Sequence, residues 1–222
     1  MIIDYFDPVR AIRFDGLASY ADTPLTGYPT AAASMSAWVK INSTMSATTT
    51  FNFIGPSGGV TRWFTFGKGA TASLAIRGGF SGGAIGHFRT SPAGYNTDQW
   101  YHFLATYDGT LFVSYIDGVQ IGSTNVAGQT ILLSGSTLQA ARFSSNYAPV
   151  TMDEISIWNR AVTVSEVATS NQPIDLYGAS GLVRWYTMGD RYVLGSYSLR
   201  DRMGGAAFSW VNAVESTQVV AR

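Results

Sequence analysis

The sequence predicts an all-β fold of the sandwich, jelly-roll or barrel type. Short segments alternate between apolar and polar residues, as strands with one buried face do. Frequent glycine-containing turns separate these segments, and no long helical pattern lies between them, which argues against an α/β fold. The clearest alternation is in residues 34–41, where one face has Met35, Ala37, Val39 and Ile41 and the other has Ser34, Ser36, Trp38 and Lys40.

The expected strands follow one another at short intervals. Asp-Gly pairs at 108–109 and 117–118 separate three of them, and both residues of such a pair tolerate positive φ. We therefore expect tight hairpins at these two pairs. In order, the expected strands cover residues 9–14, 17–21, 34–41, 51–54, 62–66, 74–77, 85–89, 100–107, 111–116, 119–121, 138–143 and 152–158.

One short helix is expected after these strands. Thr163 and Glu166 have the spacing of a capping box, in which each residue's side chain accepts a hydrogen bond from the other's backbone amide. The helix should run only to about Ala168 or Asn171.

The C-terminal part of the chain looks different from the rest. Residues 182–188, 192–199 and 206–211 are strand-like but irregular and have few turn pairs. We therefore divide the chain into one domain at residues 1–177 and a C-terminal extension or docking arm at residues 178–222.

Charged residues are few and balanced, with 14 basic and 14 acidic side chains. Nucleic-acid-binding proteins usually have a basic excess, so we expect no nucleic-acid partner. The apolar runs are too short for a membrane-spanning helix, so we expect no membrane insertion. The absence of cysteine excludes disulfides, thiolate metal sites and cysteine nucleophiles. The first residues lack the features of a signal peptide, which favours synthesis in the cytoplasm.

Three groups of residues occur in an order and spacing that carry a family resemblance. They are residues 11–20 (AIRFDGLASY) with 35–40 (MSAWVK), residues 100–109 (WYHFLATYDG) with 115–118 (YIDG), and residues 152–163 (MDEISIWNRAVT) with Glu166. Over residues 9–170 the chain resembles the laminin-G-like, pentraxin-related branch of the concanavalin-A-like lectins. The resemblance implies a jelly roll of two antiparallel sheets, in a family whose members bind glycans, proteins or surfaces.

Residues 181–190 (GLVRWYTMGD) are similar to a stretch in laminin-G-like proteins of tailed bacteriophages. This similarity implies a virion subunit, for capsid decoration or associated with a fibre, that is made in the host cytoplasm and displayed on the virion surface. We then expect a homo-oligomer with protein partners in a larger assembly, docked through Trp185, Tyr186 and Trp210. Trp185 and Trp210 would equally suit packing back on the sandwich of their own chain. The alternative is a carbohydrate-binding or adhesion module of a secreted or cell-surface protein.

The residues argue against catalysis. Glycoside hydrolases of this superfamily need two carboxylates, which alternate positions on one strand would supply. The only glutamates are Glu154, Glu166 and Glu215, and none has an acidic residue two positions away. Asp153 directly precedes Glu154, so we expect these two side chains on opposite faces of a strand. The two histidines, at positions 87 and 102, have no nucleophilic-serine motif or zinc-binding spacing to accompany them. We expect a protein that is not an enzyme.

Binding residues are sought among aromatic and arginine side chains near loops, because exposed rings stack on sugar faces and anchor protein contacts. An equally good interpretation is that the aromatic rings fill small satellite clusters. The candidates are Arg62, Trp63, Arg77, His87, Arg89, Tyr95 and Tyr147.

A calcium site is the remaining metal hypothesis. Related jelly rolls often hold one ion near the position of Asp153, and Asp15 or Asp22 are the nearest candidates for a second carboxylate. Calcium needs six to eight oxygen ligands, and the sequence has no cluster of carboxylates. The favoured alternative is that Asp153 accepts hydrogen bonds from backbone amides. We therefore expect no obligatory cofactor.

Overall fold

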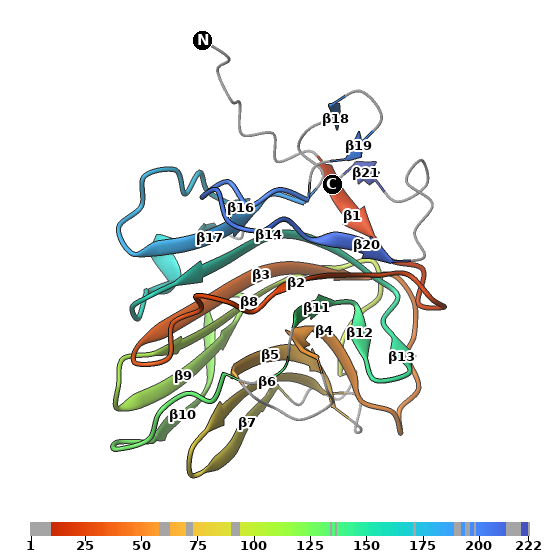
Figure 1. The fold of residues 1–222 in the computed structure, drawn as a ribbon. Helices are drawn as coiled ribbons and strands as arrows, with labels where there is room; N and C mark the ends of the chain where they lie inside the picture. Colours follow the sequence, from red (N-terminus) through yellow and green to blue (C-terminus); the bar gives the residue numbers. More distant parts are fainter. Residues whose placement is uncertain are drawn as a thin grey trace.

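The computed structural model describes residues 10–57, 63–69, 73–89, 94–133, 135, 137–170, 172–188, 192–193, 196–197, 199–211 and 219–221. Over these residues two large antiparallel sheets pack face to face as a sandwich (Figure 1). The structure confirms the predicted all-β jelly-roll sandwich with almost no helix.

The first sheet, sheet A, has eight strands. Strand β17 (Leu182–Tyr186) pairs with β14 beside the main path of the sheet. That path runs in the order β10 (Val119–Asn125), β9 (Leu111–Ile116), β8 (Trp100–Tyr107), β3 (Ala33–Ile41), β14 (Val150–Trp158), β1 (Arg10–Arg13) and β21 (Val219–Ala221).

The second sheet, sheet B, has seven strands. Their order is β20 (Ser209–Val211), β2 (Tyr20–Pro24), β11 (Thr137–Ala140), β4 (Phe51–Pro56), β5 (Trp63–Lys68), β6 (Leu74–Phe80) and β7 (Gly83–Arg89). Three short ribbons complete the described strands: β12 (Arg142–Phe143) with β13 (Asn146–Tyr147), β15 (Ala168–Thr169) with β16 (Gln172–Pro173), and β18 (Tyr192–Val193) with β19 (Ser196–Tyr197).

Both predicted Asp-Gly hairpins are present. At the β9–β10 turn, Asp117 and Gly118 have φ of 53° and 75°, the backbone that a tight two-residue turn requires. At the β8–β9 turn, Asp108 Oδ1 accepts hydrogen bonds from the amides of Thr110 and Leu111 at 2.8 and 2.7 Å. These turns fix the register of three neighbouring strands in sheet A.

The core lies between the sheets and is rich in aromatic rings. Phe103 of β8 contacts Phe53 edge-on and stacks on Phe66. Phe112 of β9 stacks on Phe64 with their centroids 5.7 Å apart. The predicted apolar face of β3 is fully buried in the same core: Met35, Ala37, Val39 and Ile41.

A second apolar cluster covers the outward side of sheet A. Residues 159–170 and 172–181 fold back over β8 and β14 there, so that side of the sheet is not exposed to solvent at these strands. The cluster consists of Leu104, Trp158, Val162, Val167, Leu176, Leu182 and Trp185.

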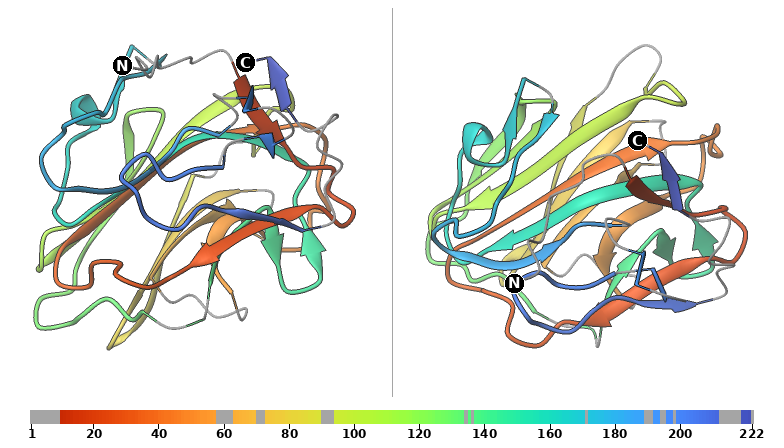
Figure 2. Two further views of the ribbon diagram at one scale, coloured as in Figure 1. Left: turned by 45° about the horizontal axis from the view of Figure 1, so that its top comes forward. Right: turned by 90° about the horizontal axis from the view of Figure 1, so that it is seen from above.

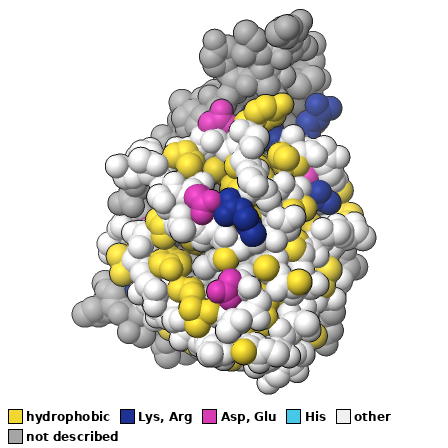
Figure 3. Space-filling model, turned by 90° about the vertical axis from the view of Figure 1, so that its left-hand side faces the viewer, with side chains coloured by type: hydrophobic (Ala, Val, Ile, Leu, Met, Phe, Trp, Pro, Cys, Tyr) yellow, Lys and Arg dark blue, Asp and Glu magenta, His cyan; other side chains and the backbone are white. Residues whose placement is uncertain are grey.

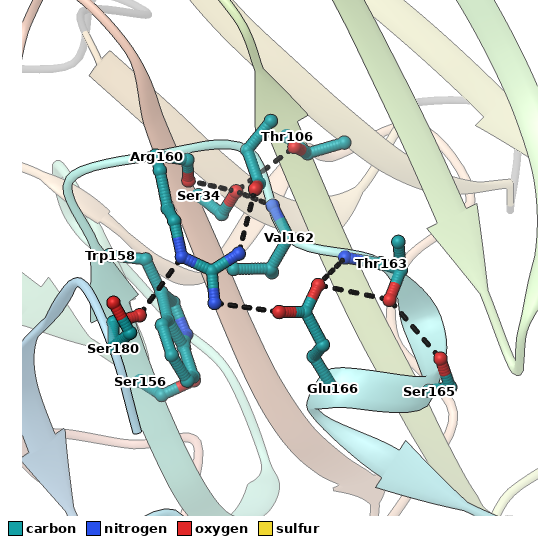
Figure 4. Close-up of polar contacts among 11 residues, drawn as sticks. Ser34, Thr106, Ser156, Trp158, Arg160, Val162, Thr163, Ser165, Glu166 and Ser180 are labelled. Atoms are coloured by element: carbon teal, nitrogen blue, oxygen red, sulfur yellow. Dashed lines mark hydrogen bonds and ion pairs between the residues drawn. The ribbon is translucent and has the colours of Figure 1, made fainter. Parts of the chain in front are cut away.

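A polar network fastens this covering segment to sheet A (Figure 4). Ser34 Oγ donates to the carbonyl of Arg160 at 2.8 Å and accepts from the amide of Val162 at 3.1 Å. The guanidinium of Arg160 lies over the Trp158 ring and pairs with Glu166 at 2.6 Å. These contacts determine where the segment after β14 turns back over the sheet.

The predicted capping box is present, but the helix is shorter than predicted. The Thr163 amide donates to Glu166 Oε2 at 2.7 Å. Hydrogen bonds, first from Arg160 and then from the Thr163 amide, lower the pKa of Glu166 to about 2. The helix is a single 3-10 turn, Val164–Glu166, because strand β15 already begins at Ala168.

The described parts of residues 178–222 add strands to both sheets. Strand β17 pairs with β14, β20 with β2, and β21 with β1. Figure 2 shows the blue C-terminal strands beside the red N-terminal strands. Whether this segment also docks onto another chain stays a prediction.

Candidate functional site

His87, a predicted ligand-binding residue, points inward from β7. Its side chain is 8% exposed, and its ring stacks on Phe112 with the centroids 4.9 Å apart. Its two ring nitrogens each lie 2.9 Å from a hydroxyl of sheet A, those of Ser114 and Thr124. His87 therefore joins the two sheets, which corrects its predicted place at an exposed binding rim.

Replacing His87 with glutamine should remove a pH-dependent part of the stability. Burial lowers the pKa of His87 below its usual 6.5. The unfolded chain thus binds a proton that the folded chain does not, and wild-type stability should fall as the pH is lowered through 6.5. Urea midpoints between pH 8 and pH 5 should slope less steeply for H87Q. Equal slopes for the two proteins would contradict this role.

Three further predicted residues serve the fold instead of a binding rim. Arg89 forms an ion pair with Asp117 of the β9–β10 turn at 2.7 Å. Trp63 is fully buried, and its indole donates to a backbone carbonyl at 3.0 Å. The hydroxyl of Tyr95 accepts a hydrogen bond from a backbone amide at 2.8 Å, and its ring packs against the core. Arg62 lies outside the described residues.

The remaining two predicted residues, Arg77 and Tyr147, lie on the outward side of sheet B. Strand register places Arg77 of β6 in line with Thr65 of β5 and Gly86 of β7. The line continues across β4, β11 and β2 in the same register. We call this line the outer row: Asp22, Gln139, Gly55, Thr65, Arg77 and Gly86.

Four side chains of the outer row carry polar groups: Asp22 and Arg77 are partly exposed, whereas Thr65 and Gln139 are only 2% and 8% exposed. Within the described residues, no hydrogen bond or ion pair engages the side chains of Asp22, Gln139, Thr65 and Arg77. They offer a carboxylate, an amide, a hydroxyl and a guanidinium, which together supply both donors and acceptors. Strands lie about 4.8 Å apart, so the row from Asp22 to Arg77 spans roughly 19 Å.

Phe88 adds an exposed aromatic ring beside Arg77, and the sequence analysis missed it. The Phe88 side chain is 45% exposed, and the guanidinium carbon of Arg77 lies 5.5 Å from its ring centroid. Gly86 provides the space, because a Cβ at that position would lie 2.9 Å from the ring. A flat apolar ring next to an unpaired guanidinium is suited to a ligand with both apolar and polar faces.

Tyr147 belongs to a second aromatic group near the other end of the outer row. The guanidinium carbon of Arg142 lies 4.4 Å from the ring centroid of Tyr20 and 5.8 Å from that of Tyr147. Tyr20 precedes Asp22 by two residues, so both side chains leave the same face of β2. We call these three residues the Arg142 cluster. The outer row therefore has an arginine and aromatic rings at each end.

Charged side chains do not form a large field of one sign on the face shown in Figure 3, where they are few and mixed with uncharged groups. The helical residues in the described part of the chain form no segment long and apolar enough to span a membrane.

Comparison with known families decides the identity of the fold. A model described as the concanavalin A-like lectin/glucanases superfamily matches residues 15–168. The chain belongs to this superfamily. Comparison with curated protein sequences gave no match.

Solved structures of the lectin/glucanase fold are similar to the chain. One, described as a candidate carbohydrate-binding protein from Bacteroides ovatus, has a TM-score of 0.67 and 16% identity, with 96% of this chain and 59% of that chain covered. The heptameric SAP-like pentraxin from Limulus polyphemus has a TM-score of 0.53 and 15% identity, with 76% and 86% covered. The Trypanosoma rangeli sialidase in complex with sialic acid has a TM-score of 0.51 and 15% identity, with 70% of this chain but 26% of that chain covered. At these identities the similarity shows the fold alone.

The superfamily includes glucanases, and a two-carboxylate hydrolase would need a pair of accessible carboxylates. Asp153 and Glu154 face the same side of β14, not opposite sides as predicted, because a β-bulge lies between Asp153 and Ser156 and Glu154 has φ of 51°. The Trp185 indole donates to Glu154 Oε2 at 2.6 Å on the outward side of sheet A. Both carboxylates are buried there. The outer row of sheet B contains one carboxylate, Asp22, whereas a two-carboxylate hydrolase needs a pair.

Asp15 and Asp153 do not form a shared calcium site. Arg13 lies opposite Thr151 in the β1–β14 ladder, which places Asp15 and Asp153 four residues apart along it, or roughly 13 Å at about 3.3 Å per residue. Burial alone raises the pKa of Asp15, but hydrogen bonds from the Ser19 hydroxyl and three backbone amides lower it to about 2. Asp153 Oδ1 accepts from the backbone amide of Glu154 at 2.9 Å, as the alternative predicted.

Two of the predicted docking residues are buried within this chain. Trp185 is 2% exposed and belongs to the apolar cluster outside sheet A, while Tyr186 is 0% exposed and its ring lies 4.7 Å from that of Phe208. Neither side chain has a free face for a partner. Trp185 therefore packs back on the sandwich, as its alternative interpretation had it, and the predicted docking role of Tyr186 is corrected. The side chain of Trp210 lies outside the described residues.

Proposed function

We propose that this chain is a non-catalytic carbohydrate-binding module that holds its ligand on the outward side of sheet B. The observation that carries the proposal is the outer row, whose polar side chains have no partner within the described residues and which ends at Arg77 beside the exposed ring of Phe88. Sugar hydroxyls need donors and acceptors in one surface, and the apolar face of a sugar ring packs on an aromatic ring.

Two further findings support this proposal. The superfamily is described by its lectins and glucanases, and a similar structure is described as a candidate carbohydrate-binding protein. The outer row has donors and acceptors but lacks the second carboxylate that hydrolysis by two carboxylates requires. Recognition without bond cleavage is therefore the activity that these residues support.

Substituting Phe88 or Arg77 with alanine should weaken glycan binding at least tenfold, about 1.4 kcal/mol, because each removes a main contact at the Arg77 end of the surface. A glycan array identifies the ligand for the wild-type chain, and titration calorimetry then measures each variant. R13A and L111A are matched controls, since both residues are exposed on sheet A. Undiminished binding in both F88A and R77A would exclude this surface, and an array without any bound glycan would exclude the function.

The virion role stays a separate prediction. It derives from the similarity of residues 181–190 to phage laminin-G-like proteins, and it includes display on the virion surface and homo-oligomerisation. Neighbouring capsid or portal genes would support it, and so would attachment of the purified chain to particles. Attachment combined with a glycan array that shows no binding would favour this role over the carbohydrate-binding module.

A further inference from the structure

Arg77 lacks a carboxylate partner among the described residues, whereas three other arginines of the chain each form an ion pair. Arg89 pairs with Asp117 at 2.7 Å, and Arg160 pairs with Glu166 at 2.6 Å. A third pair joins Arg184 to Asp201 at 3.3 Å. Within the part of the chain that the structure describes, Arg77 has no carboxylate, hydroxyl or carbonyl partner, and its one polar contact is with the face of the Phe88 ring.

A partly buried guanidinium without an anionic partner lowers the stability of the folded chain. Burial lowers the pKa of Arg77, although an arginine keeps its charge at neutral pH. A partly buried cation is stabilised by an anion that replaces the lost water. The planar fork of N–H groups fits the two oxygens of a carboxylate better than a single hydroxyl.

The surroundings of Arg77 favour an anionic group at this end of the outer row. Its neighbours across the sheet, Thr65 and Gly86, carry no charge. Asp22 is the one acidic member of the row and lies four strands away, roughly 19 Å at about 4.8 Å per strand. Repulsion from Asp22 over that distance is largely screened at physiological salt.

Arg142 provides a second cation near the Asp22 end. Its Nε donates to the carbonyl of Ser144 at 2.9 Å, and its guanidinium is held against the rings of Tyr20 and Tyr147. No ion pair engages it within the described residues. A glycan that lies along the outer row would therefore meet a guanidinium at each end.

We infer that the ligand of the outer row is an anionic glycan and that Arg77 binds a carboxylate of one of its sugar rings. This inference rests on the proposed function and specifies its ligand class. Phe88 packs against the same ring, and Asp22, four strands away, accepts from hydroxyl groups of a ring further along the glycan.

The test uses oligosaccharides that differ only in charge. An oligogalacturonate, its carboxyl-reduced neutral form and a sulfated form of that neutral oligosaccharide are titrated against the wild-type chain. We expect the oligogalacturonate to bind at least tenfold more tightly than its neutral form, with a dissociation constant that rises with salt. Equal binding of the charged and neutral forms would overturn the inference and leave the proposed function intact. Stronger binding of the sulfated form than of the oligogalacturonate would overturn the choice of a carboxylate.

Variants connect this preference to Arg77. R77Q should abolish the difference between the oligogalacturonate and its neutral form, while R77K should retain a reduced preference because it keeps the charge and loses the fork. R13Q is the control, as it removes an exposed arginine of sheet A. A preference that survives in R77Q would place the anion elsewhere. If none of the three oligosaccharides nor any glycan of the array binds, the proposed function fails as well.

Discussion

A chain cut after Tyr177 should not fold, because residues 178–222 supply strands to both sheets. Strand β17 contributes Leu182 and Trp185 to the cluster outside sheet A and Tyr186 to the core. Full burial of one large apolar side chain contributes about 1.5–3 kcal/mol. Three such losses, with the lost pairing of β17 to β14, approach the total stability of about 5–15 kcal/mol that is usual for a domain.

The truncated chain is best compared with the full chain by near-ultraviolet circular dichroism and amide NMR. We expect little near-ultraviolet signal and poor amide dispersion for residues 1–177. Adding residues 178–222 as a separate peptide should restore both, since β17 would recover its place beside β14. A truncated chain that is monomeric and unfolds cooperatively would mean that the C-terminal segment is an independent arm after all.

The sequence predicted the strands whose signals are local. Alternation in residues 34–41 and the Asp-Gly pairs needed no knowledge of the partner strands, and both features are present. Pairing of β3 with β8 also brings His102 Nε2 to 2.7 Å from Ser36 Oγ, so this histidine bonds across the sheet. The C-terminal strands were harder, because β17 is short and pairs with a strand more than twenty positions earlier, a contact that no local pattern specifies.

The binding surface was predicted only in part, because period-2 alternation does not say which side of a strand faces inward. In β7 it separates His87 and Arg89 from Phe88, yet the usual rule would bury the phenylalanine. In the structure Phe88 points outward, whereas His87 and Arg89 point inward because they bond to polar groups of sheet A. The bulge at Glu154 has no sequence signal either, because positive φ is uncommon for glutamate.

Replacing Phe112 with alanine should destabilise the fold by about 3–5 kcal/mol, the usual cost of removing a fully buried phenylalanine. Phe112 is 0% exposed, and it stacks on Phe64 and His87 and lies edge-on to Phe80. The substitution therefore removes a ring that contacts three others between the sheets. Guanidinium denaturation monitored by tryptophan fluorescence measures the change in unfolding free energy.

Leu111 is the matched control, because it is the preceding residue of β9, points to the other side and is 37% exposed. L111A should change the unfolding free energy by less than about 0.5 kcal/mol, as exposed positions usually do. F112L separates lost volume from lost stacking, since leucine fills part of the cavity but provides no ring. If F112L lowers the unfolding free energy as much as F112A does, the lost stacking against Phe64 and His87 is the larger effect. If F112A lowers it by less than about 1 kcal/mol, the core closes over the cavity and Phe112 does not hold the sheets together.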